Sequence, residues 1–379
     1  MDNGSRRSFV AWRCRYDDTR GPTKGGIRFH PDASLDEVVT LAFWMTFKCS
    51  VAGLPYGGGK GAIQVDTRQL SKAELERLSR AYVHAFAQMI GPERDIPAPD
   101  VYTNAMVMGW MADEYSSLVG YPSPGVITGK PIALGGSQGR EDATARGGFY
   151  VLKHLQQELG LTGEEERTAV IQGFGNAGYF IACLLHEDGW RILGISDSDS
   201  GIYCSTGLDP QAVKACKDKH GKVASYAEEG SGVQLLENRE LLCIKCNLLI
   251  PAALENQIDT DIAERIDTGV ILELANGPVT AAADTILERR GIPVLPDILA
   301  NAGGVSVSYF EWVQNRQGFY WTVEEVQQRL KKIMEEEAMQ VWRKSQQKGI
   351  SLRTAAYVHG LDRLSEAIEA HGTQLYFNG

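Results

Sequence analysis

A short apolar run, a glycine-rich turn and a helical segment follow one another directly, and this order constrains the fold most. The apolar run is Thr168–Gln172, the turn Gly173-Phe174-Gly175-Asn176-Ala177-Gly178 has the pattern Gly-x-Gly-x-x-Gly, and a helical pattern covers 179–188. Between a strand and a helix, such glycines let a pyrophosphate approach the helix N-terminus. The unit therefore predicts a dinucleotide-binding domain.

The same alternation of strand, turn and helix patterns continues along the chain. The next predicted strand ends at Asp197, where an acidic side chain can bind the ribose of the nucleotide. The alternative is that Asp197 only forms the serine-rich turn at 196–201. Short apolar runs at 248–250, 270–274 and 292–295 predict further strands. Together these units indicate a doubly wound, Rossmann-like sheet.

A denser glycine pattern, Gly57-Gly58-Gly59-Lys60-Gly61, marks the first part of the chain. We expect a loop here, at the start of a short strand at 62–66, in which a substrate can reach the ammonium group closely. A phosphate-binding P-loop is excluded, because that motif needs Ser or Thr after the lysine. Partial desolvation lowers a lysine pKa toward neutrality, so Lys60 is a candidate base or nucleophile. A glycine turn with an incidental lysine is the alternative.

Two further lysines and an aspartate accompany this pattern. Lys24 begins a second glycine cluster, and Lys48 lies near the end of an apolar helix. The run Ile96-Pro97-Ala98-Pro99 precedes Asp100, and its prolines stiffen the chain there. We expect a helix at 101–119 that places Asp100 at its beginning. Cations and a carboxylate gathered in this way predict an acid–base pair.

Most of the remaining pattern is helical. Ser34 and Ser71 each stand three residues before a glutamate, which is the spacing of a capping box at a helix start. Toward the C-terminus, apolar residues recur at helical spacing across 322–348 and 351–371. We expect two long helices there, with charged faces in solvent.

Length and charge limit the class of protein. At 379 residues the chain exceeds one ordinary core, so we expect two domains. The net charge is −10 and the pI is near 5.3, without a lysine- or arginine-rich tract. Nucleic acids and membrane surfaces call for concentrated positive charge, so we expect neither as a partner. No apolar run approaches the length of a membrane span and no signal peptide is recognisable, so we expect a soluble, cytoplasmic protein.

The seven cysteines are scattered and odd in number. They do not suit a disulfide framework in a chain of this length, so we expect reduced thiols. Cys243 and Cys246 have the spacing of half a zinc site, but no second pair completes four ligands. We therefore expect no metal, and we expect this pair to pack at a strand start.

Further runs complete an ordered set of motifs with the lysine, aspartate and glycine segments. They are Thr128-Gly129-Lys130, Leu249-Ile250-Pro251-Ala252-Ala253-Leu254, Ala275-Asn276-Gly277-Pro278 and Asn301-Ala302-Gly303-Gly304-Val305-Ser306-Val307-Ser308-Tyr309-Phe310-Glu311-Trp312. In this order the set resembles the glutamate/leucine/phenylalanine/valine dehydrogenase family, most closely its glutamate dehydrogenases. The likeness extends from the first residues to the C-terminal helices.

This resemblance implies an α/β fold of two domains with the active site in the cleft between them. Residues 1–135 plus 355–379 would form a substrate-binding and oligomerisation domain, and 136–354 a Rossmann-like dinucleotide-binding domain. Family members form homohexamers, so we expect a homo-oligomer, most simply a hexamer. The opening strand Phe9-Val10-Ala11-Trp12 exposes apolar residues that would pair with another subunit.

The resemblance also implies an activity, the NAD(P)-dependent, reversible oxidative deamination of L-glutamate to 2-oxoglutarate and ammonia. Lys60 corresponds to the lysine that activates water, and Asp100 to the carboxylate that shuttles protons. Lys24 and Ser308 correspond to the positions that hold the side-chain carboxylate, and Lys48 to the one that holds the α-carboxylate. The chemistry is consistent, because a diacid carries two carboxylates that each need a cation or strong donors.

Two groups of binding residues follow from the matched motifs. The expected substrate-binding residues are Lys24, Gly25, Lys48, Thr128, Val305 and Ser308. The expected cofactor-binding residues are Gly173, Gly175, Asn176, Ala177, Asp197, Asn276 and Asn301. Because no arginine lies in the turn after Asp197 to receive a 2′-phosphate, we favour NAD, with NADP not excluded.

The chain departs from the family pattern in three places. Several dozen mostly helical residues would usually precede Met1, so we expect a weakened assembly. Leu274 stands where glycine is usual, and Asn247 where an acid is usual. Two alternative functions are kept: a dehydrogenase of branched-chain or aromatic amino acids, in which the position of Lys24 is apolar, and a catalytically silent nucleotide-binding or regulatory subunit.

Overall fold

A computed structural model describes residues 1–162, 167–229 and 232–372. Within it the chain forms two compact units. The first contains Met1–Arg140, Val305–Arg329 and the described residues from Val358 onward, and the second contains Glu141–Gly304 and Leu330–Tyr357. Residues 163–166, 230–231 and 373–379, which the expected domains include, lie outside the described residues.

The two units differ from the expected domain boundaries in one long segment. Residues 305–329, expected in the second domain, belong to the first unit. Helix α12 (Gly303–Gln317) explains this, because its Glu311 side chain forms a buried ion pair with Lys130 of the first unit. The aromatic rings of Tyr309 and Trp312 also contact Tyr56.

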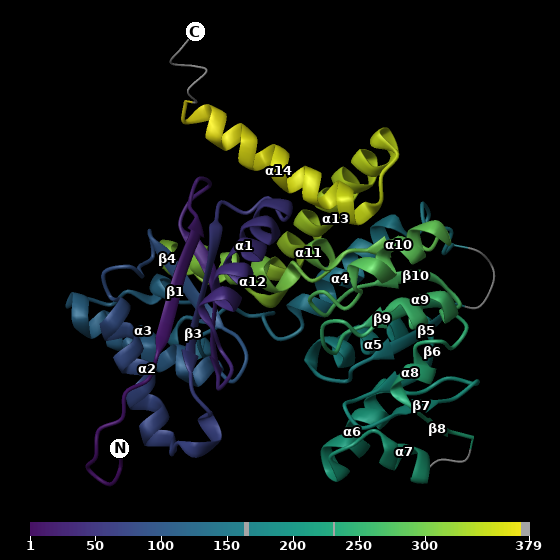
Figure 1. The fold of residues 1–379 in the computed structure, drawn as a ribbon, viewed down its shortest axis with the longest axis horizontal. Coiled ribbons are helices and arrows are strands. Elements are labelled where there is room, and N and C mark those ends of the chain that lie inside the picture. Colours follow the sequence, from purple (N-terminus) through teal and green to yellow (C-terminus); the bar gives the residue numbers. More distant parts are fainter. Residues whose placement is uncertain (163–166, 230–231, 373–379) are drawn as a thin grey trace. The chain divides into compact units, whose positions relative to one another are not determined.

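The first unit is built on a four-stranded sheet (Figure 1). Its strands are β1 (Ala11–Asp17), β2 (Thr23–His30), β3 (Gly57–Gln64) and β4 (Asp95–Pro99), in the order β1-β3-β2-β4. β2 pairs in parallel with β3 and β4, whereas β1 is an antiparallel edge strand. The carboxyl ends of β2, β3 and β4 therefore lie at one edge of the sheet.

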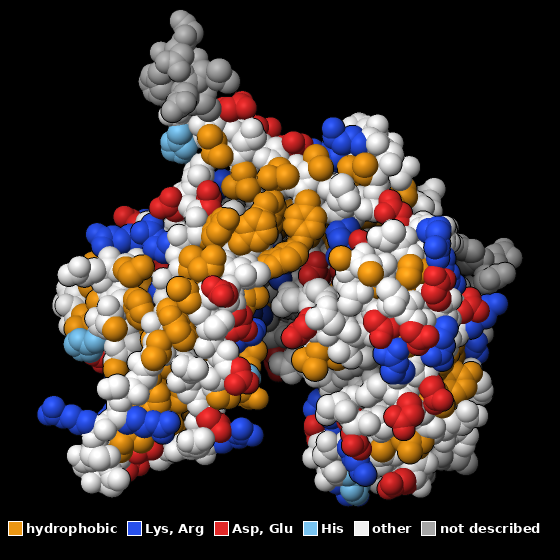
Figure 2. All heavy atoms as spheres, in the orientation of Figure 1, with side chains coloured by type: hydrophobic (Ala, Val, Ile, Leu, Met, Phe, Trp, Pro, Cys, Tyr) orange, Lys and Arg blue, Asp and Glu red, His pale blue; other side chains and the backbone are white. Residues whose placement is uncertain are grey.

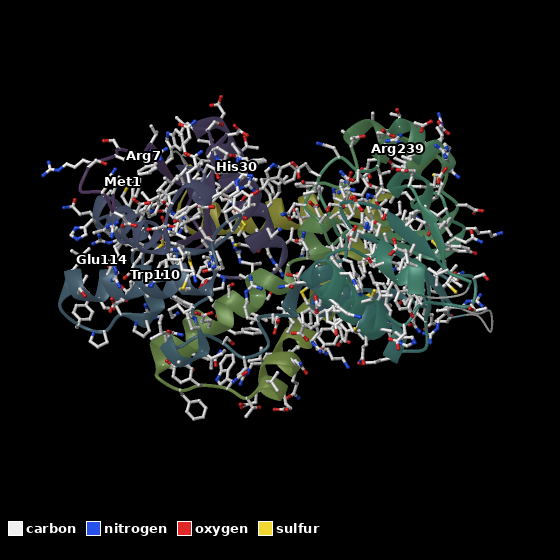
Figure 3. All side chains as sticks on the ribbon, turned by 90° about the horizontal axis from the view of Figure 1, so that it is seen from below. Met1, Arg7, His30, Trp110, Glu114 and Arg239 are labelled. Carbon is white, nitrogen blue, oxygen red and sulfur yellow. The ribbon has the colours of Figure 1, made fainter. Side chains whose placement is uncertain are left out.

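Side chains along β2 point alternately to a face that packs in the core and to a polar face. Ile27 and Phe29 are fully buried against α2 (Lys72–Phe86) and α3 (Ala105–Val119). Ser71 forms the expected capping box with Glu74 at the start of α2. The segment before β1 lies along α2, where Asp2 pairs with Arg77, and Figure 3 labels Met1 and Arg7 in this segment.

The glycine clusters are strands, so the expectation of loops around the lysines was wrong. Gly57 to Gly61 form most of β3, and Lys24 and Gly25 lie within β2. The reason is close backbone approach: a Cβ on Gly25 would stand 1.6 Å from the Gly59 carbonyl oxygen. A Cβ on Gly58 would stand 2.3 Å from a carbonyl oxygen of α1 (Leu35–Val51), which packs over this part of β3.

Helix α3 also begins later than expected. Its N-cap is Asn104, whose side chain accepts a hydrogen bond from the Val107 N–H, so Asp100 lies before the helix rather than at its first turn. Tyr102 has a φ of 56°, a left-handed conformation that does not continue into a right-handed helix. The turn positions Asp100 separately from α3.

The second unit is built on a seven-stranded sheet with the order β11-β10-β9-β5-β6-β7-β8 (Figure 1). The strands are β5 (Thr168–Gln172), β6 (Arg191–Ser196), β7 (Gly201–Tyr203), β8 (Gln234–Leu236), β9 (Cys246–Pro251), β10 (Thr268–Leu272) and β11 (Val294–Leu295). The five strands from β11 to β6 are parallel, and β7 and β8 are antiparallel. The expected doubly wound sheet is confirmed, and the order of its strands along the chain reverses between β5 and β9.

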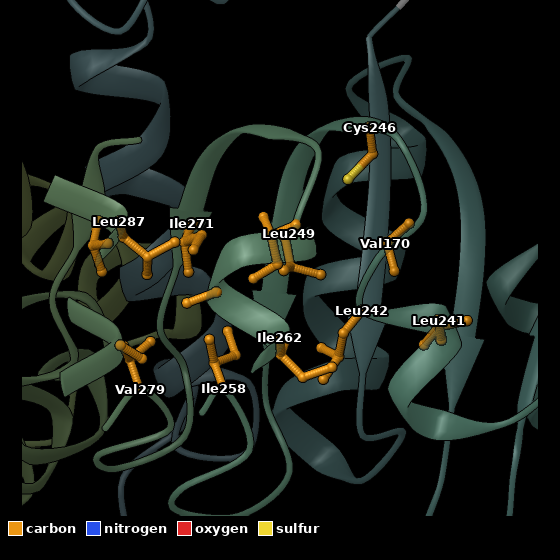
Figure 4. Packing of buried hydrophobic residues seen from close by; sticks show 14 of the residues in the cluster. Val170, Leu241, Leu242, Cys246, Leu249, Ile258, Ile262, Ile271, Val279 and Leu287 are labelled. Atoms are coloured by element: carbon orange, nitrogen blue, oxygen red, sulfur yellow. The ribbon is translucent and has the colours of Figure 1, made fainter. Parts of the chain in front are cut away.

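Helices pack on this sheet around an apolar core. Figure 4 shows Val170, Leu249 and Ile271 of three neighbouring strands facing Ile262 of α9 (Thr260–Arg265). The other helices of this unit are α4 (Ala143–Leu155), α5 (Asn176–Glu187), α6 (Pro210–His220), α7 (Ala224–Glu229), α8 (Asn238–Leu241), α10 (Ala281–Arg289) and α11 (Asp297–Ala300). Two further helices, α13 (Val323–Lys348) and α14 (Leu352–Ala370), each have residues in both units. The two long C-terminal helices are confirmed.

The cysteines are free thiols, and Cys246 is buried at the start of β9 as expected. Within the described ranges, no helix is both long enough and apolar enough to cross a membrane.

Candidate functional site

Lysines 24 and 60 lie on neighbouring strands of the first sheet and are both buried. Side chains two residues apart on a strand share a face, so Lys24, Gly26 and Arg28 of β2 face the same side. A Cβ on Gly26 would stand 2.7 Å from the Asp100 Cβ. The glycine thus leaves the space in which Asp100 meets Lys60.

Lys60 and Asp100 form a close ion pair. The Lys60 Nζ lies 2.6 Å from Oδ2 of Asp100, and the Arg28 Nε donates to the same oxygen at 3.1 Å. Burial lowers the pKa of Lys60 although Asp100 counters it. Burial alone would raise the pKa of Asp100, but the charges of Lys60 and Arg28 together lower it. The pair is therefore an ionised carboxylate beside a lysine that gives up its proton more readily than usual.

Lys24 is buried without such a partner. The residue is 1% exposed, and no described residue forms a hydrogen bond or ion pair with its ammonium group. Burial lowers the pKa of Lys24 to about 7; Cys49 opposes this shift, and the cations Arg13 and Arg140 add to it. A buried cation without a counter-ion is costly unless a ligand neutralises it. This position is therefore suited to an anionic group of a ligand.

Lys48 lies in the last turn of α1, next to Cys49. Burial raises the pKa of the Cys49 thiol to about 12, and the charges of Lys24 and Lys48 oppose that rise. Both lysines therefore lie close to this thiol. The structure thus gathers two of the expected substrate cations at one end of α1.

The remaining expected substrate residues come from the segment at 128–130 and from α12. The Gly129 N–H donates to Oε2 of Glu311, and the Lys130 Nζ donates to Oε1 of the same carboxylate at 2.6 Å. This buried pair fixes the Thr128 segment against α12. The Thr128 hydroxyl is buried and has no hydrogen-bond partner among the described residues, so it is free to bind a ligand. Ser308 lies one helical turn before Glu311 and is buried, and Val305 is half-buried on the same helix.

Sequence reasoning missed two arginines of this region. Arg28 contacts Asp100, and the alternation that places it on the face of Lys24 could have identified it. Arg140 has a buried Nε with no hydrogen-bond partner among the described residues, and its charge lowers the pKa of Lys24. No sequence signal marked Arg140, because its effect depends on the position of a strand more than a hundred residues earlier.

A buried ion pair supports the strand that carries Lys24. Arg13 of β1 is bidentate to Asp95 of β4, with its Nε 2.6 Å from Oδ2. The same guanidinium donates to the carbonyl oxygens of Gly25 and Gly26. Both partners of the pair are fully buried. Arg13 thus holds the backbone between Lys24 and Arg28 in place.

In the second unit, the glycine turn lies at the carboxyl end of β5. Gly173 has a φ of 92°, and a Cβ on it would stand 2.8 Å from the backbone of Ala253, which follows β9. Gly178 packs against the Gly173 carbonyl oxygen, where a Cβ would stand at 1.8 Å. Gly175 is the N-cap of α5, with open space where a Cβ would lie. An exposed helix N-terminus beside a glycine turn suits a pyrophosphate.

Asp197 follows β6 at the same edge of the sheet, but its carboxylate is already engaged. It accepts hydrogen bonds from the N–H groups of Val223 at 2.8 Å, of Asp199 at 3.0 Å and of Ser200 at 3.4 Å. Burial would raise the pKa of Asp197, and these bonds lower it. These contacts support the turn-forming alternative. The Lys217 Nζ lies 3.6 Å from Oδ2 of Asp197. The sequence did not identify this cation.

The other expected cofactor residues meet beyond β10. The Asn301 Nδ2 donates to Oδ1 of Asn276 at 3.0 Å, while the Asn301 Oδ1 is buried without a partner among the described residues. Asp297 accepts from the Gly277 N–H, and its own N–H donates to Glu273. Burial raises the pKa of Glu273 to about 7 although Arg353, its bidentate partner, opposes the shift. The loop is thus anchored, and one amide oxygen remains available to a ligand.

These residues fit a dinucleotide better than a metal ion. The glycine turn, the free N-terminus of α5 and the orphan oxygen of Asn301 are the features that such a cofactor needs. Among the described residues, no group of three or more His, Cys, Asp or Glu side chains could hold a metal ion.

Comparison with known families gives two matches that cover most of the chain. Residues 135–372 match the model described as glutamate/leucine/phenylalanine/valine dehydrogenase. Residues 1–117 match the dimerisation domain of the same group.

Two curated relatives illustrate the likeness. The NADP-specific glutamate dehydrogenase of Synechocystis is 52% identical over 100% of this chain and 89% of the relative. The catabolic NAD-specific glutamate dehydrogenase of Bacillus subtilis is 47% identical over 98% of this chain and 86% of the relative.

Solved structures show the same fold. The hetero-hexameric glutamate dehydrogenase from Thermus thermophilus, in a leucine-bound form, has a TM-score of 0.91 and 37% identity, covering 98% of this chain and 88% of that one. The glutamate dehydrogenase from Peptoniphilus asaccharolyticus has a TM-score of 0.87 and 38% identity, covering 98% and 89%.

Proposed function

This chain belongs to the glutamate/leucine/phenylalanine/valine dehydrogenase family, and we propose that it catalyses the reversible, NAD(P)-dependent oxidative deamination of L-glutamate to 2-oxoglutarate and ammonia. Relatives at 47% and 52% identity, named as glutamate dehydrogenases, support this choice within the family.

One observation carries the choice of substrate. Lys24 is 1% exposed and its ammonium group has no counter-ion among the described residues, whereas the buried Lys60 and Lys130 each have a carboxylate partner. A side-chain carboxylate of the substrate supplies the missing negative charge. Ser308, Thr128 and Gly25 contribute around it, with Val305 covering the aliphatic part of the substrate.

The second carboxylate and the reacting carbon have their own partners. Lys48 binds the α-carboxylate. Lys60, whose pKa is lowered by burial, activates the water that releases ammonia. Asp100, ionised and next to Lys60, takes protons from the substrate nitrogen and returns them. These roles follow from one positioned acid–base pair.

The cofactor is a nicotinamide dinucleotide. The chemistry that it supplies when bound is acceptance of a hydride from the substrate α-carbon. Gly173, Gly175, Asn176 and Ala177 hold the pyrophosphate at the N-terminus of α5. Asn276 and Asn301 orient the nicotinamide end, and Asp197 shapes the ribose site.

We propose NAD as the preferred cofactor, with NADP also accepted. Curated relatives include both an NADP-specific and an NAD-specific enzyme. Because the Asp197 carboxylate is engaged by main-chain N–H groups, it does not by itself reject a 2′-phosphate. The cytoplasmic location expected from the sequence stays a prediction.

Both alternative functions conflict with particular residues. A dehydrogenase of leucine, valine or phenylalanine would bury the Lys24 cation against an apolar side chain. A silent regulatory subunit would not need the Lys60–Asp100 pair, which is intact at 2.6 Å.

We propose that the protein assembles as a homohexamer through the first unit. Figure 2 shows apolar side chains gathered over α1 and the neighbouring strand β1. Of the residues on these elements, Tyr16 of β1 is 48% exposed and Trp44 of α1 is 40% exposed. An edge strand with such neighbours needs cover. A monomeric mass by light scattering at micromolar concentration contradicts this assembly.

The activity is tested with purified protein. The rate of nicotinamide reduction is measured with glutamate and with leucine, each with NAD and with NADP. We expect glutamate-dependent reduction with at least one cofactor and little with leucine. Equal rates with leucine contradict the substrate, and no reduction with either amino acid contradicts the enzyme assignment.

A further inference from the structure

Arg28 connects the acid–base pair to helix α1. Its Nε donates to Oδ2 of Asp100 at 3.1 Å, and its Nη1 forms an ion pair with Glu37 in the first turn of α1. The Arg28 side chain is 23% exposed, as is that of Asp100. A planar guanidinium held at two points has a fixed orientation, which a single contact does not provide.

The two carboxylate oxygens of Asp100 have different surroundings. Oδ2 accepts from both Lys60 and Arg28, whereas Oδ1 has no partner among the described residues. The backbone is fixed as well, because the Asp100 N–H donates to the Thr103 hydroxyl at 2.8 Å. The two cations therefore hold Oδ2, whereas no described residue holds Oδ1.

We propose that Arg28 is a positioning residue that, oriented by Glu37, fixes Asp100 through Oδ2, so that Oδ1 is the oxygen that exchanges protons with the substrate. The proposal rests on the proposed function for the identity of the substrate. Oδ1 takes one proton from the substrate nitrogen and later returns it, and Arg28 itself transfers none.

The surrounding charges give this arrangement a measurable signature. Asp100 faces Lys60 of β3 and Arg28 of β2, and Glu37 of α1 acts on Arg28. Arg28 lowers the pKa of Asp100, and it also lowers the pKa of Lys60, as does Arg13 of β1. Loss of the Arg28 charge should therefore raise both pKa values.

The test compares Arg28→Gln and Arg28→Lys with the matched control Arg15→Gln. Arg15 is an arginine on the edge strand β1 of the same sheet, in an exposed ion pair with Asp18. For Arg28→Gln we expect kcat for glutamate to fall by about 10- to 100-fold, with a smaller change in KM, because a positioned acid or base contributes about 10²–10⁴. The acidic limb of the pH profile of kcat/KM should move to higher pH. The control should match wild type in both respects.

Arg28→Lys separates charge from geometry. Lysine keeps the positive charge but makes a single point contact. We expect the acidic limb to return to its wild-type position while kcat stays reduced. Wild-type kcat in this variant contradicts the need for a two-point hold. If Arg28→Gln does not fold, as judged by thermal melting, this variant still carries the test.

A second readout does not depend on the assigned substrate. Lys60 is labelled by reductive methylation across a pH series, and its modification is followed by peptide mass spectrometry. In Arg28→Gln the midpoint for Lys60 labelling should move to higher pH, whereas in Arg15→Gln it should not. If wild type lacks glutamate activity but the labelling midpoint moves, the proposed substrate is wrong and the contact with Arg28 stands. If neither the labelling midpoint nor the acidic limb moves, the role of Arg28 is wrong.

Discussion

Lys24 of β2 and Lys60 of β3 are both buried on the same sheet, yet their charges are balanced differently. Lys60 has a carboxylate partner at 2.6 Å, whereas no described residue pairs with Lys24. A cation with an internal partner is prepared for chemistry before any ligand arrives. A cation without one gains its counter-ion from the ligand, and so it selects the ligand.

The largest expected effect comes from the internally balanced pair. Lys60→Met and Asp100→Asn should each lower kcat by at least about 10²-fold, the usual scale for a positioned acid or base. KM for glutamate should change much less, because Lys24 and Lys48 remain. Steady-state kinetics measures both parameters. Near-wild-type turnover in both variants would contradict the view that Lys60 serves the chemistry whereas Lys24 selects the ligand.

The stability of the strand that carries Lys24 should depend on the buried ion pair of Arg13 and Asp95. Arg13→Met leaves Asp95 buried without a partner, which costs roughly 3–5 kcal/mol of unfolding free energy. Denaturant unfolding followed by fluorescence measures this loss. The exposed pair of Lys214 and Asp218 on α6 offers a control, since Lys214→Met should cost less than about 1 kcal/mol. Equal losses for the two variants would contradict a supporting role for Arg13.

The pH dependence of KM for glutamate should report the charge of Lys24 and so distinguish it from Lys60. The pKa of Lys24 is lowered to about 7 by burial, so in the ligand-free protein its ammonium is charged below that pH and loses its proton above it. Because only the charged form binds a carboxylate, KM for glutamate should rise about tenfold per pH unit above about pH 7. Lys24→Leu should remove this dependence. A KM for glutamate that stays constant between about pH 7 and 9 would contradict it.

The smallest expected effect concerns Asp197, whose charge is also balanced within the protein. Asp197→Ser removes acceptors of three main-chain N–H groups, so we expect a loss of about 0.5–2 kcal/mol in stability, as for a lost helix cap. The NAD/NADP ratio of kcat/KM should change by less than about tenfold. A larger change would show that the carboxylate recognises the ribose directly.

The doubly wound sheet could be predicted because its pattern is local. Thr168–Gln172 and the glycine turn after it carry their signal within a few residues, and the long helix at 322–348 has helical periodicity. The strand character of Gly57–Gln64 could not be predicted in this way, because glycine is depleted in strands. Only the contact between Gly25 and the Gly59 carbonyl, which depends on strand pairing, explains it.

The sequence singled out two side chains that the structure brings together, but it did not predict the contacts around them. Lys60 and Asp100 stood out by their neighbours in sequence, and the structure brings them together. The contact of Arg28 with Asp100 depends on the register in which Ile27 of β2 lies beside Pro99 of β4. That no described residue pairs with Lys24 depends likewise on every segment that surrounds it.

The most direct test is the preference for glutamate over leucine in wild type and in the double variant that combines Lys24→Leu with Ser308→Val. A buried cation facing an apolar side chain costs roughly 3–5 kcal/mol, and about 1.4 kcal/mol corresponds to a factor of ten. We therefore predict that wild-type kcat/KM favours glutamate by about 10²–10³ or more. We predict that Lys24→Leu, combined with Ser308→Val, loses most glutamate activity and gains activity toward leucine, valine or norleucine. Equal use of leucine by wild type, or full glutamate activity in the double variant, would contradict the assignment of Lys24 to the side-chain carboxylate.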